Sequence, residues 1–186
     1  MILVSASPRA YVGGALFAAS LILLYGTSAA YHLIDWKPAL RRMVRRLDHS
    51  MIFVLIVGTY SPFCLVAVGR AWGISILSVV GGLAAFGMLL QLVRPAAPRW
   101  LGVAVYVGLG WVALAAASEI LAEISAVAIF LLILGGVAYS LGGAVYAARR
   151  PNLFLPAFGF HELFHLLVIT ASAIHYSVIA IYILPS

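Results

Sequence analysis

The sequence predicts an all-α membrane protein, a polytopic bundle of six transmembrane helices. Hydrophobic residues fill 65% of the 186 positions and charged residues only 9%, whereas a soluble domain carries about 25% charged residues. The mean hydropathy is +1.15, and six apolar stretches approach the roughly 20 residues that a helix needs to cross a bilayer. We therefore expect a single transmembrane domain over 1–186, with any function carried by the helices and their short loops.

The six apolar stretches give the expected helices in chain order. We place them at about 10–34, 47–69, 73–93, 99–118, 124–147 and 158–184. Prolines, glycines or clustered charges separate each pair of stretches, at Pro38, at Gly69, at Pro95 with Pro98, at 119–123 and at 149–152. Pro62 lies inside the second stretch, where we expect it to kink the helix and to free a carbonyl.

Basic residues are concentrated in three of the five connections. These connections hold nine of them: Lys37, Arg41, Arg42, Arg45, Arg46, Arg94, Arg99, Arg149 and Arg150. The other side holds only Arg9 and Arg70. The positive-inside rule puts the three basic connections in the cytoplasm, so that both ends of this chain face outward. We attribute the net charge of +6 to topology and headgroup contact rather than to nucleic-acid binding.

This topology, derived from lysine and arginine alone, gathers ionisable side chains at the cytoplasmic boundary. The candidates are His32, Asp48, His161, Glu162 and His165. Such side chains are costly within or beside a membrane, so each of them needs a reason. We interpret two further histidines, His49 and His175, as amphipathic residues outside the site, because His175 lies too deep to share an ion with the others. Cys64 is the single cysteine, which excludes a disulfide framework and a cysteine-based metal site.

The spacing of the histidines predicts a metal centre. His161 and His165 are four residues apart, hence on one face of a helix, and His32 lies at the right depth to add a third ligand. Three imidazoles and one open position are typical of a catalytic zinc site, although imidazole also suits copper, nickel and iron. Asp48 could accept a proton from an activated water, and Ser28, one turn before His32, could orient a ligand. Two alternatives stay open, because Asp48 could merely cap its helix and Ser28 could bond its own backbone.

Residues 161–165 also read His-Glu-Leu-Phe-His, the H-E-x-x-H pattern of metalloproteases. In those enzymes the two histidines bind zinc and the glutamate is the general base. An intramembrane protease of the site-2 type places this pattern in a transmembrane helix, with an aspartate elsewhere as the third ligand. Asp48 could take that role, and Glu162 would then be the base.

A wider set of motifs resembles the bacterial hemolysin III proteins of the progestin and adipoQ receptor superfamily, relatives of the adiponectin receptors. The motifs are Ser-Ala-Ala-Tyr-His at 28–32, Leu-Asp-His-Ser-Met-Ile at 47–52, Gly-Thr-Tyr-Ser-Pro-Phe at 58–63 and His-Glu-Leu-Phe-His at 161–165, with His-Tyr at 175–176. The resemblance implies that His32, His161 and His165 bind Zn²⁺. It also implies that Asp48 contacts the zinc-bound water, that Ser28 lies near the site, and that Glu162 is not the base.

The family has seven transmembrane helices, with its N-terminus inside and its C-terminus outside. Against that pattern, residues 1–7 match the end of the first helix, so we expect this chain to keep the last six. The missing helix carries none of the metal ligands. The outward C-terminus agrees with the orientation from basic residues, and a bacterial protein of this kind is expected in the inner (plasma) membrane.

Three functions are compatible with these residues. The first is a zinc-dependent hydrolase of a membrane-lipid amide or ester, an activity that the resemblance implies because adiponectin receptors and alkaline ceramidases are linked to ceramide hydrolysis. The second is a non-enzymatic membrane-homeostasis or pore-forming hemolysin with structural zinc. A pore requires polar mid-bilayer faces, for which there are few residues: Ser75, Ser78, Gln91, Ser140 and Ser172. The third is the site-2-type protease.

Overall fold

The computed structural model describes residues 7–93, 98–152 and 158–185, which are nearly all helical. The α-helices are α1 (Pro8–Leu33), α2 (Pro38–Pro62), α3 (Arg70–Val93), α4 (Arg99–Gly110), α5 (Ala117–Glu123), α6 (Ala126–Ala148) and α7 (Phe160–Val178). Two π-helical turns, Phe63–Ala67 and Ile179–Ile183, continue α2 and α7, and the 3-10 turn Trp111–Ala116 joins α4 to α5. Arg94, Pro95 and positions 1–6, on which some expectations fall, lie outside the described residues.

The described helices form an all-α polytopic membrane bundle, as the composition predicts. Five of them are long and apolar enough to cross a bilayer, namely α1, α3, α6, and α2 and α7 with their π-helical turns. A sixth span results if Arg99–Ala115 and Ala117–Glu123 are counted together, although the two parts are bent by 63°. The expectation of one regular helix over 99–118 therefore differs from the structure.

The change from α-helix to the 3-10 turn after Gly110 coincides with a contact from the side chain of Tyr60. Its hydroxyl accepts a hydrogen bond from the Ala113 N–H (2.8 Å) and donates toward the Gly110 carbonyl (2.9 Å). A side chain that inserts into the backbone hydrogen-bond ladder disturbs the helix at that point. Tyr60 comes from α2, so hydropathy along the chain could not reveal this contact.

Helix α2 begins at Pro38 rather than near residue 47, because the basic segment is itself helical. Proline is favoured at the first position of a helix, and arginine is a good helix former. The consequence is that Arg45 projects from the same rigid helix as Asp48 and His49 instead of from a loop. At its other end α2 passes through Pro62 into the π-helical turn, where the Val68 N–H donates to the Phe63 carbonyl (3.0 Å).

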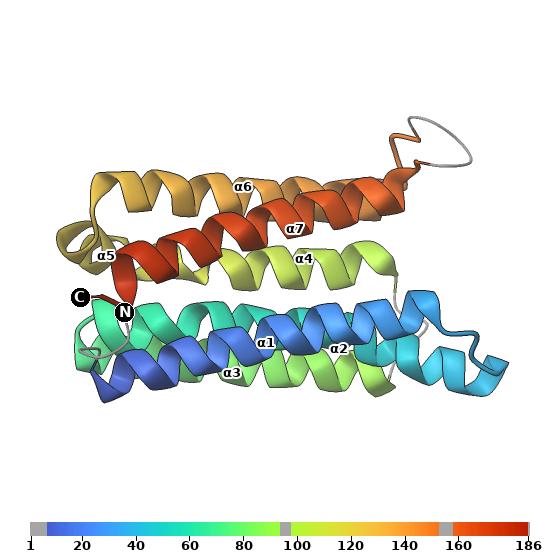
Figure 1. Ribbon diagram of the computed structural model, residues 1–186, viewed down its shortest axis with the longest axis horizontal. Helices are drawn as coiled ribbons and strands as arrows, with labels where there is room; N and C mark the ends of the chain where they lie inside the picture. Colours follow the sequence, from blue (N-terminus) through green and yellow to red (C-terminus); the bar gives the residue numbers. More distant parts are fainter. Residues whose placement is uncertain (1–6, 94–97, 153–157, 186) are drawn as a thin grey trace.

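The helices that pack closely against each other are α1 with α2, α2 with α3, α4 with α6, and α6 with α7 (Figure 1). The first and last helices also meet, because the Tyr25 hydroxyl of α1 bonds the Ser172 hydroxyl of α7 (2.8 Å). Helix α1 begins and the Ile179–Ile183 turn ends at the same end of the bundle. We call this the far end, and we call the opposite end, where α1 ends and α2 and α7 begin, the site end.

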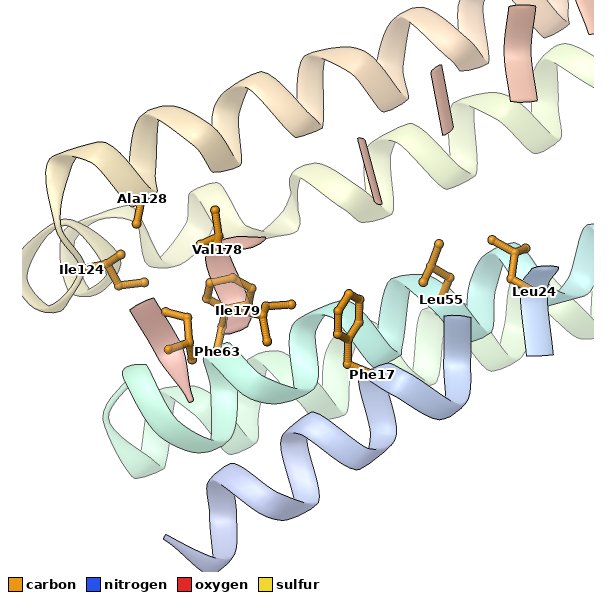
Figure 2. Packing of buried hydrophobic residues seen from close by; sticks show 9 residues of the cluster. Phe17, Leu24, Leu55, Phe63, Ile124, Ala128, Val178 and Ile179 are labelled. Atoms are coloured by element: carbon orange, nitrogen blue, oxygen red, sulfur yellow. The ribbon is translucent and has the colours of Figure 1, made fainter. Parts of the chain in front are cut away.

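Buried apolar side chains join α1, α2, α6 and α7 toward the far end (Figure 2). Phe17 and Phe63 pack with Val178 and Ile179, the last of which is 1% exposed. Gly13 of α1 allows a close approach in this region, since a Cβ built there would lie 2.8 Å from the Cα of Pro62. The apolar packing at the far end is therefore close.

Candidate metal centre and its vestibule

The N-terminus of α7 brings two histidines to the site end. The Glu162 carboxylate accepts a hydrogen bond from the Gly159 N–H (2.8 Å), and the Asn152 side chain accepts one from the Phe160 N–H (3.2 Å). These contacts satisfy backbone donors that the first turn of a helix leaves unpaired. They fix the turn that carries His161, with His165 one turn further along the same face.

Helix α1 supplies the third histidine from a distant part of the sequence. His32 lies in the last turn of α1, and the chain leaves the helix at Ile34 in an extended conformation. The Trp36 indole then donates to the Ala30 carbonyl (2.9 Å), which holds the connection against the helix end. His32 is exposed, whereas His161 and His165 are half-buried, so the cluster opens at the end of the bundle.

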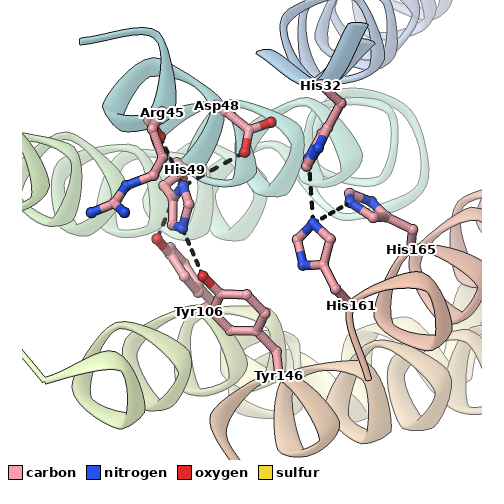
Figure 3. A network of polar contacts seen from close by, with 8 residues as sticks. All are labelled: His32, Arg45, Asp48, His49, Tyr106, Tyr146, His161 and His165. Carbon is pink, nitrogen blue, oxygen red and sulfur yellow. Dashed lines mark hydrogen bonds and ion pairs between the residues drawn. The ribbon is translucent and has the colours of Figure 1, made fainter. Parts of the chain in front are cut away.

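The three imidazoles lie at the spacing of ligands on a single ion (Figure 3). The Nε2 atom of His161 is 3.3 Å from Nε2 of His32 and 3.1 Å from Nε2 of His165. Tetrahedral zinc with bonds of about 2.0–2.1 Å separates its nitrogen ligands by about 3.3 Å. Hydrogen bonding alone explains the cluster poorly, because one ring nitrogen of a neutral imidazole is either a donor or an acceptor. The donor set and its spacing therefore fit a metal ion.

Asp48 faces a cavity that adjoins this cluster. The cavity has a volume of about 320 Å³ and is lined by residues of α1, α2, α3, α4, α6 and α7, together with Pro98. We call it the vestibule. Its ionisable lining residues are His32, Arg45, Arg46, Asp48, His49, Arg99 and His161. The Asp48 side chain is 15% exposed and lies 3.6 Å from His49 Nδ1, so it belongs to the cavity wall rather than to open solvent.

A polar network on the opposite wall was not expected from the sequence. His49 Nδ1 donates to the Arg45 carbonyl (2.8 Å), because a carbonyl oxygen can only accept. In the neutral ring this leaves Nε2 as the acceptor for the Tyr146 hydroxyl of α6 (2.8 Å). The Tyr106 hydroxyl donates to the His49 carbonyl (3.3 Å), and the Tyr146 ring lies 6.2 Å from that of His161. His49 therefore lines the vestibule, held by two hydrogen bonds, and is not merely an interfacial residue.

The other candidates occupy different positions. Ser28 is half-buried on α1, one turn deeper than His32, and is not among the residues lining the vestibule. His175 lies deep in the bundle, with Nε2 3.3 Å from the Leu132 carbonyl of α6. Glu162 is exposed and caps its own helix. The one signal that could have revealed Tyr146 is its place near the end of α6, at the depth of the histidines.

These features define a polytopic helical membrane protein with a cluster of three histidines at one end of its spans. The chain belongs to the family described as haemolysin-III related, whose model matches residues 1–176. A hemolysin-3 homolog of Bacillus subtilis is 32% identical over 158 residues, covering 85% of this chain and 71% of that protein. Hemolysin-3 of Bacillus cereus is 29% identical over 177 residues, covering 95% and 78%.

A receptor branch is also related to this chain. The adiponectin receptor protein of Drosophila melanogaster is 30% identical over 182 residues, which cover 89% of this chain and 41% of that protein. The expected resemblance to hemolysin III proteins and to the progestin and adipoQ receptor superfamily is thus confirmed. Zinc binding and hydrolysis remain predictions for this chain.

Proposed function

We propose that this protein is a zinc-dependent hydrolase of a lipid amide or ester. The proposal rests on one observation: three imidazole nitrogens from α1 and α7 lie at ligand spacing beside a cavity that also contains a carboxylate. His32, His161 and His165 would hold the ion and leave a fourth tetrahedral position open, whereas structural zinc sites normally have four protein ligands. When bound, zinc would polarise a carbonyl oxygen and activate a water molecule.

The remaining chemistry falls to residues of the chain. Asp48 is the proposed proton acceptor, because its carboxylate lines the cavity and is largely shielded from solvent. Ser28 is proposed to orient His32 from one helical turn deeper. The site end is proposed to face the cytoplasm, because basic residues gather there. Seven described Lys and Arg residues come from 37–46 and 149–150, and Arg99 is an eighth. A lipid linkage near the headgroup would then lie at the depth of the three histidines.

The protease alternative assigns the base to Glu162 instead. Here the Glu162 carboxylate accepts the Gly159 N–H, a contact that turns it toward its own helix terminus. This contact supports a role of Glu162 in capping the helix. It is the reason why we assign the proton acceptor to Asp48. The two functions also differ in their third ligand, so retention of zinc by His32→Ala would favour the protease.

Hydrolysis can be tested with purified protein in detergent. The zinc-loaded chain should release fatty acid from a ceramide or from an ester lipid, as family resemblance to the adiponectin receptors implies. Chelation should stop the release, and added zinc should restore it. If zinc-loaded protein releases fatty acid from neither substrate class, the hydrolase proposal fails, and structural zinc in a non-enzymatic membrane protein becomes the better explanation.

A further inference from the structure

The vestibule has a cationic wall that the metal centre does not use. Arg45 and Arg46 of α2 and Arg99 at the start of α4 line it, against a single described carboxylate, that of Asp48. Figure 3 shows Arg45 on the far side of His49 from the three histidines. A bound molecule could therefore contact the arginines at one side of the cavity and the histidines at the other.

Two of these arginines are held by contacts to the protein. The Arg46 Nη1 donates to the Leu92 carbonyl of α3 (3.4 Å), and the Arg99 guanidinium lies over the Tyr146 ring, 5.6 Å from its centroid. A ring contact engages the flat face of a guanidinium and leaves its in-plane N–H groups able to donate. The ring contact thus partly orients the Arg99 guanidinium before a ligand arrives, which lowers the entropy that binding must overcome, whereas the surface contact of Arg46 at 3.4 Å is weak.

The general excess of positive charge at this end does not explain the arrangement. Lys37, Arg42, Arg149 and Arg150 lie at the same end and do not line the vestibule. They are sufficient for a topology signal, which depends on the number of basic residues near the span ends and not on a shared cavity. The convergence of three arginines from α2 and α4 on one cavity needs a separate reason.

We propose that the arginine wall of the vestibule is a phosphate-binding subsite. Guanidinium groups bind phosphate oxygens through paired, charge-assisted hydrogen bonds. The cavity, at about 320 Å³, is near the lower limit of ligand pockets, about 300 Å³, so it suits a headgroup rather than a whole lipid. The identification of a phosphate-bearing lipid as the substrate rests on the proposed hydrolase function, whereas the subsite itself does not.

Binding can be measured without turnover, in detergent-purified full-length protein. Three probes separate the sources of the phosphate: a short-chain phosphatidate, the diacylglycerol with the same acyl chains, and inorganic phosphate. Phosphatidate should bind about tenfold or more tightly than diacylglycerol, because one charge-assisted contact is worth about that factor. Equal affinity for these two lipids would overturn the proposal. If inorganic phosphate binds as tightly as phosphatidate, a free phosphate is the ligand and the lipid assignment is overturned.

A matched pair of double variants tests the wall. Arg45→Gln with Arg99→Gln should weaken phosphatidate binding by about tenfold or more, whereas Arg42→Gln with Arg150→Gln should change it by less than about threefold. If the basic residues only attracted anionic lipid through their charge, both pairs would weaken phosphatidate binding equally. That result would refute the subsite. Unchanged zinc content in each variant shows an intact bundle.

The lysine variants and a metal-free variant complete the test. Arg45→Lys with Arg99→Lys keeps the charge but loses the paired geometry, so its affinity should fall between wild type and the glutamine pair. In His161→Ala, without zinc, phosphatidate binding should persist and should still fall with Arg45→Gln and Arg99→Gln. Loss of that dependence would contradict an arginine subsite, whereas a failure to hydrolyse any lipid would affect only the proposed function.

Discussion

The two ends of the bundle are built differently. At the far end, Val178 and Ile179 are almost fully buried among apolar side chains from four helices. At the site end, His32 is exposed, and a cavity of about 320 Å³ separates the helices. Polar contacts such as that of His49 with Tyr146 replace apolar packing there.

If the proposed metal centre carries the function, this difference separates stability from function along the axis of the bundle. Within a bilayer, apolar helices gain little from the hydrophobic effect, and close packing and interhelical hydrogen bonds hold them together. The far end supplies that packing. The site end can then carry a cavity and ionisable side chains, because the rest of the bundle already fixes the positions of α1 and α7. Substitutions at the two ends should have separable effects.

The largest expected effect is the loss of zinc in His161→Ala. Removal of a residue that hydrogen-bonds to a metal ligand lowers metal affinity about 10- to 100-fold. Loss of a direct ligand should lower metal affinity by more than about 100-fold. Zinc per chain, measured after gel filtration, should fall close to zero in His161→Ala and His32→Ala, while the fold is retained. His49→Gln, at the same depth but outside the cluster, should keep its zinc. Full zinc content in both alanine variants would refute a metal centre at the site end.

A second large effect is expected for Asp48→Asn. The amide cannot accept the proton, so fatty-acid release should fall by about a hundredfold or more. The measurement is the rate of release at full zinc occupancy. Asp35→Asn is the matched control, because Asp35 is an exposed carboxylate in the α1–α2 connection, and it should leave the rate unchanged. Zinc loss in Asp48→Asn would instead indicate that Asp48 is a direct ligand, which would favour a structural site or the protease over the hydrolase.

At the far end, Ile179→Ala should lower the free energy of unfolding without affecting zinc. In soluble proteins such a truncation costs about 2–5 kcal/mol. The expected loss here is smaller, about 1–3 kcal/mol, because only the packing part of that cost applies against lipid. Thermal unfolding in detergent gives the measurement. Ile181→Ala is the control, since Ile181 is 63% exposed on the same turn. An equal loss of unfolding free energy in that variant would contradict close packing around Ile179.

The histidine cluster was predictable in part, because two of its signals can be read along the chain. The spacing of His161 and His165 places them on one face, and the distribution of lysine and arginine sets the depth of His32. The structure confirms that the three imidazoles lie together. Which ion they bind stays a prediction, as do the roles of Asp48 and Ser28.

The vestibule could not be predicted, because it depends on which helices lie beside each other. Hydropathy gives the span of each helix but not its lateral neighbours, so the pairing of His49 with Tyr146, 97 residues apart, leaves no pattern in one sequence. The 3-10 turn after α4 was missed for a similar reason, since the Tyr60 hydroxyl that contacts it comes from α2. The early start of α2 at Pro38 was missed because charge was taken as evidence for a loop.

The smallest expected effect tests whether the polar network of the site end contributes to stability. Tyr146→Phe removes the hydroxyl that donates to His49 Nε2. A typical hydrogen bond contributes about 0.5–1.5 kcal/mol, and the loss should lie at the lower limit, because the His49 side chain is 22% exposed and water can replace the donor. Thermal unfolding should therefore shift slightly, with zinc content unchanged.

Tyr182→Phe, at the far end, provides the control for removing a tyrosine hydroxyl, since that side chain is exposed, and its unfolding should match wild type. A loss of zinc in Tyr146→Phe would mean that the network and the metal centre form one unit, because the Tyr146 ring lies close to that of His161. The site end would then depend on its own polar contacts for its shape, and the packing of the far end alone would not be sufficient to position the three histidines.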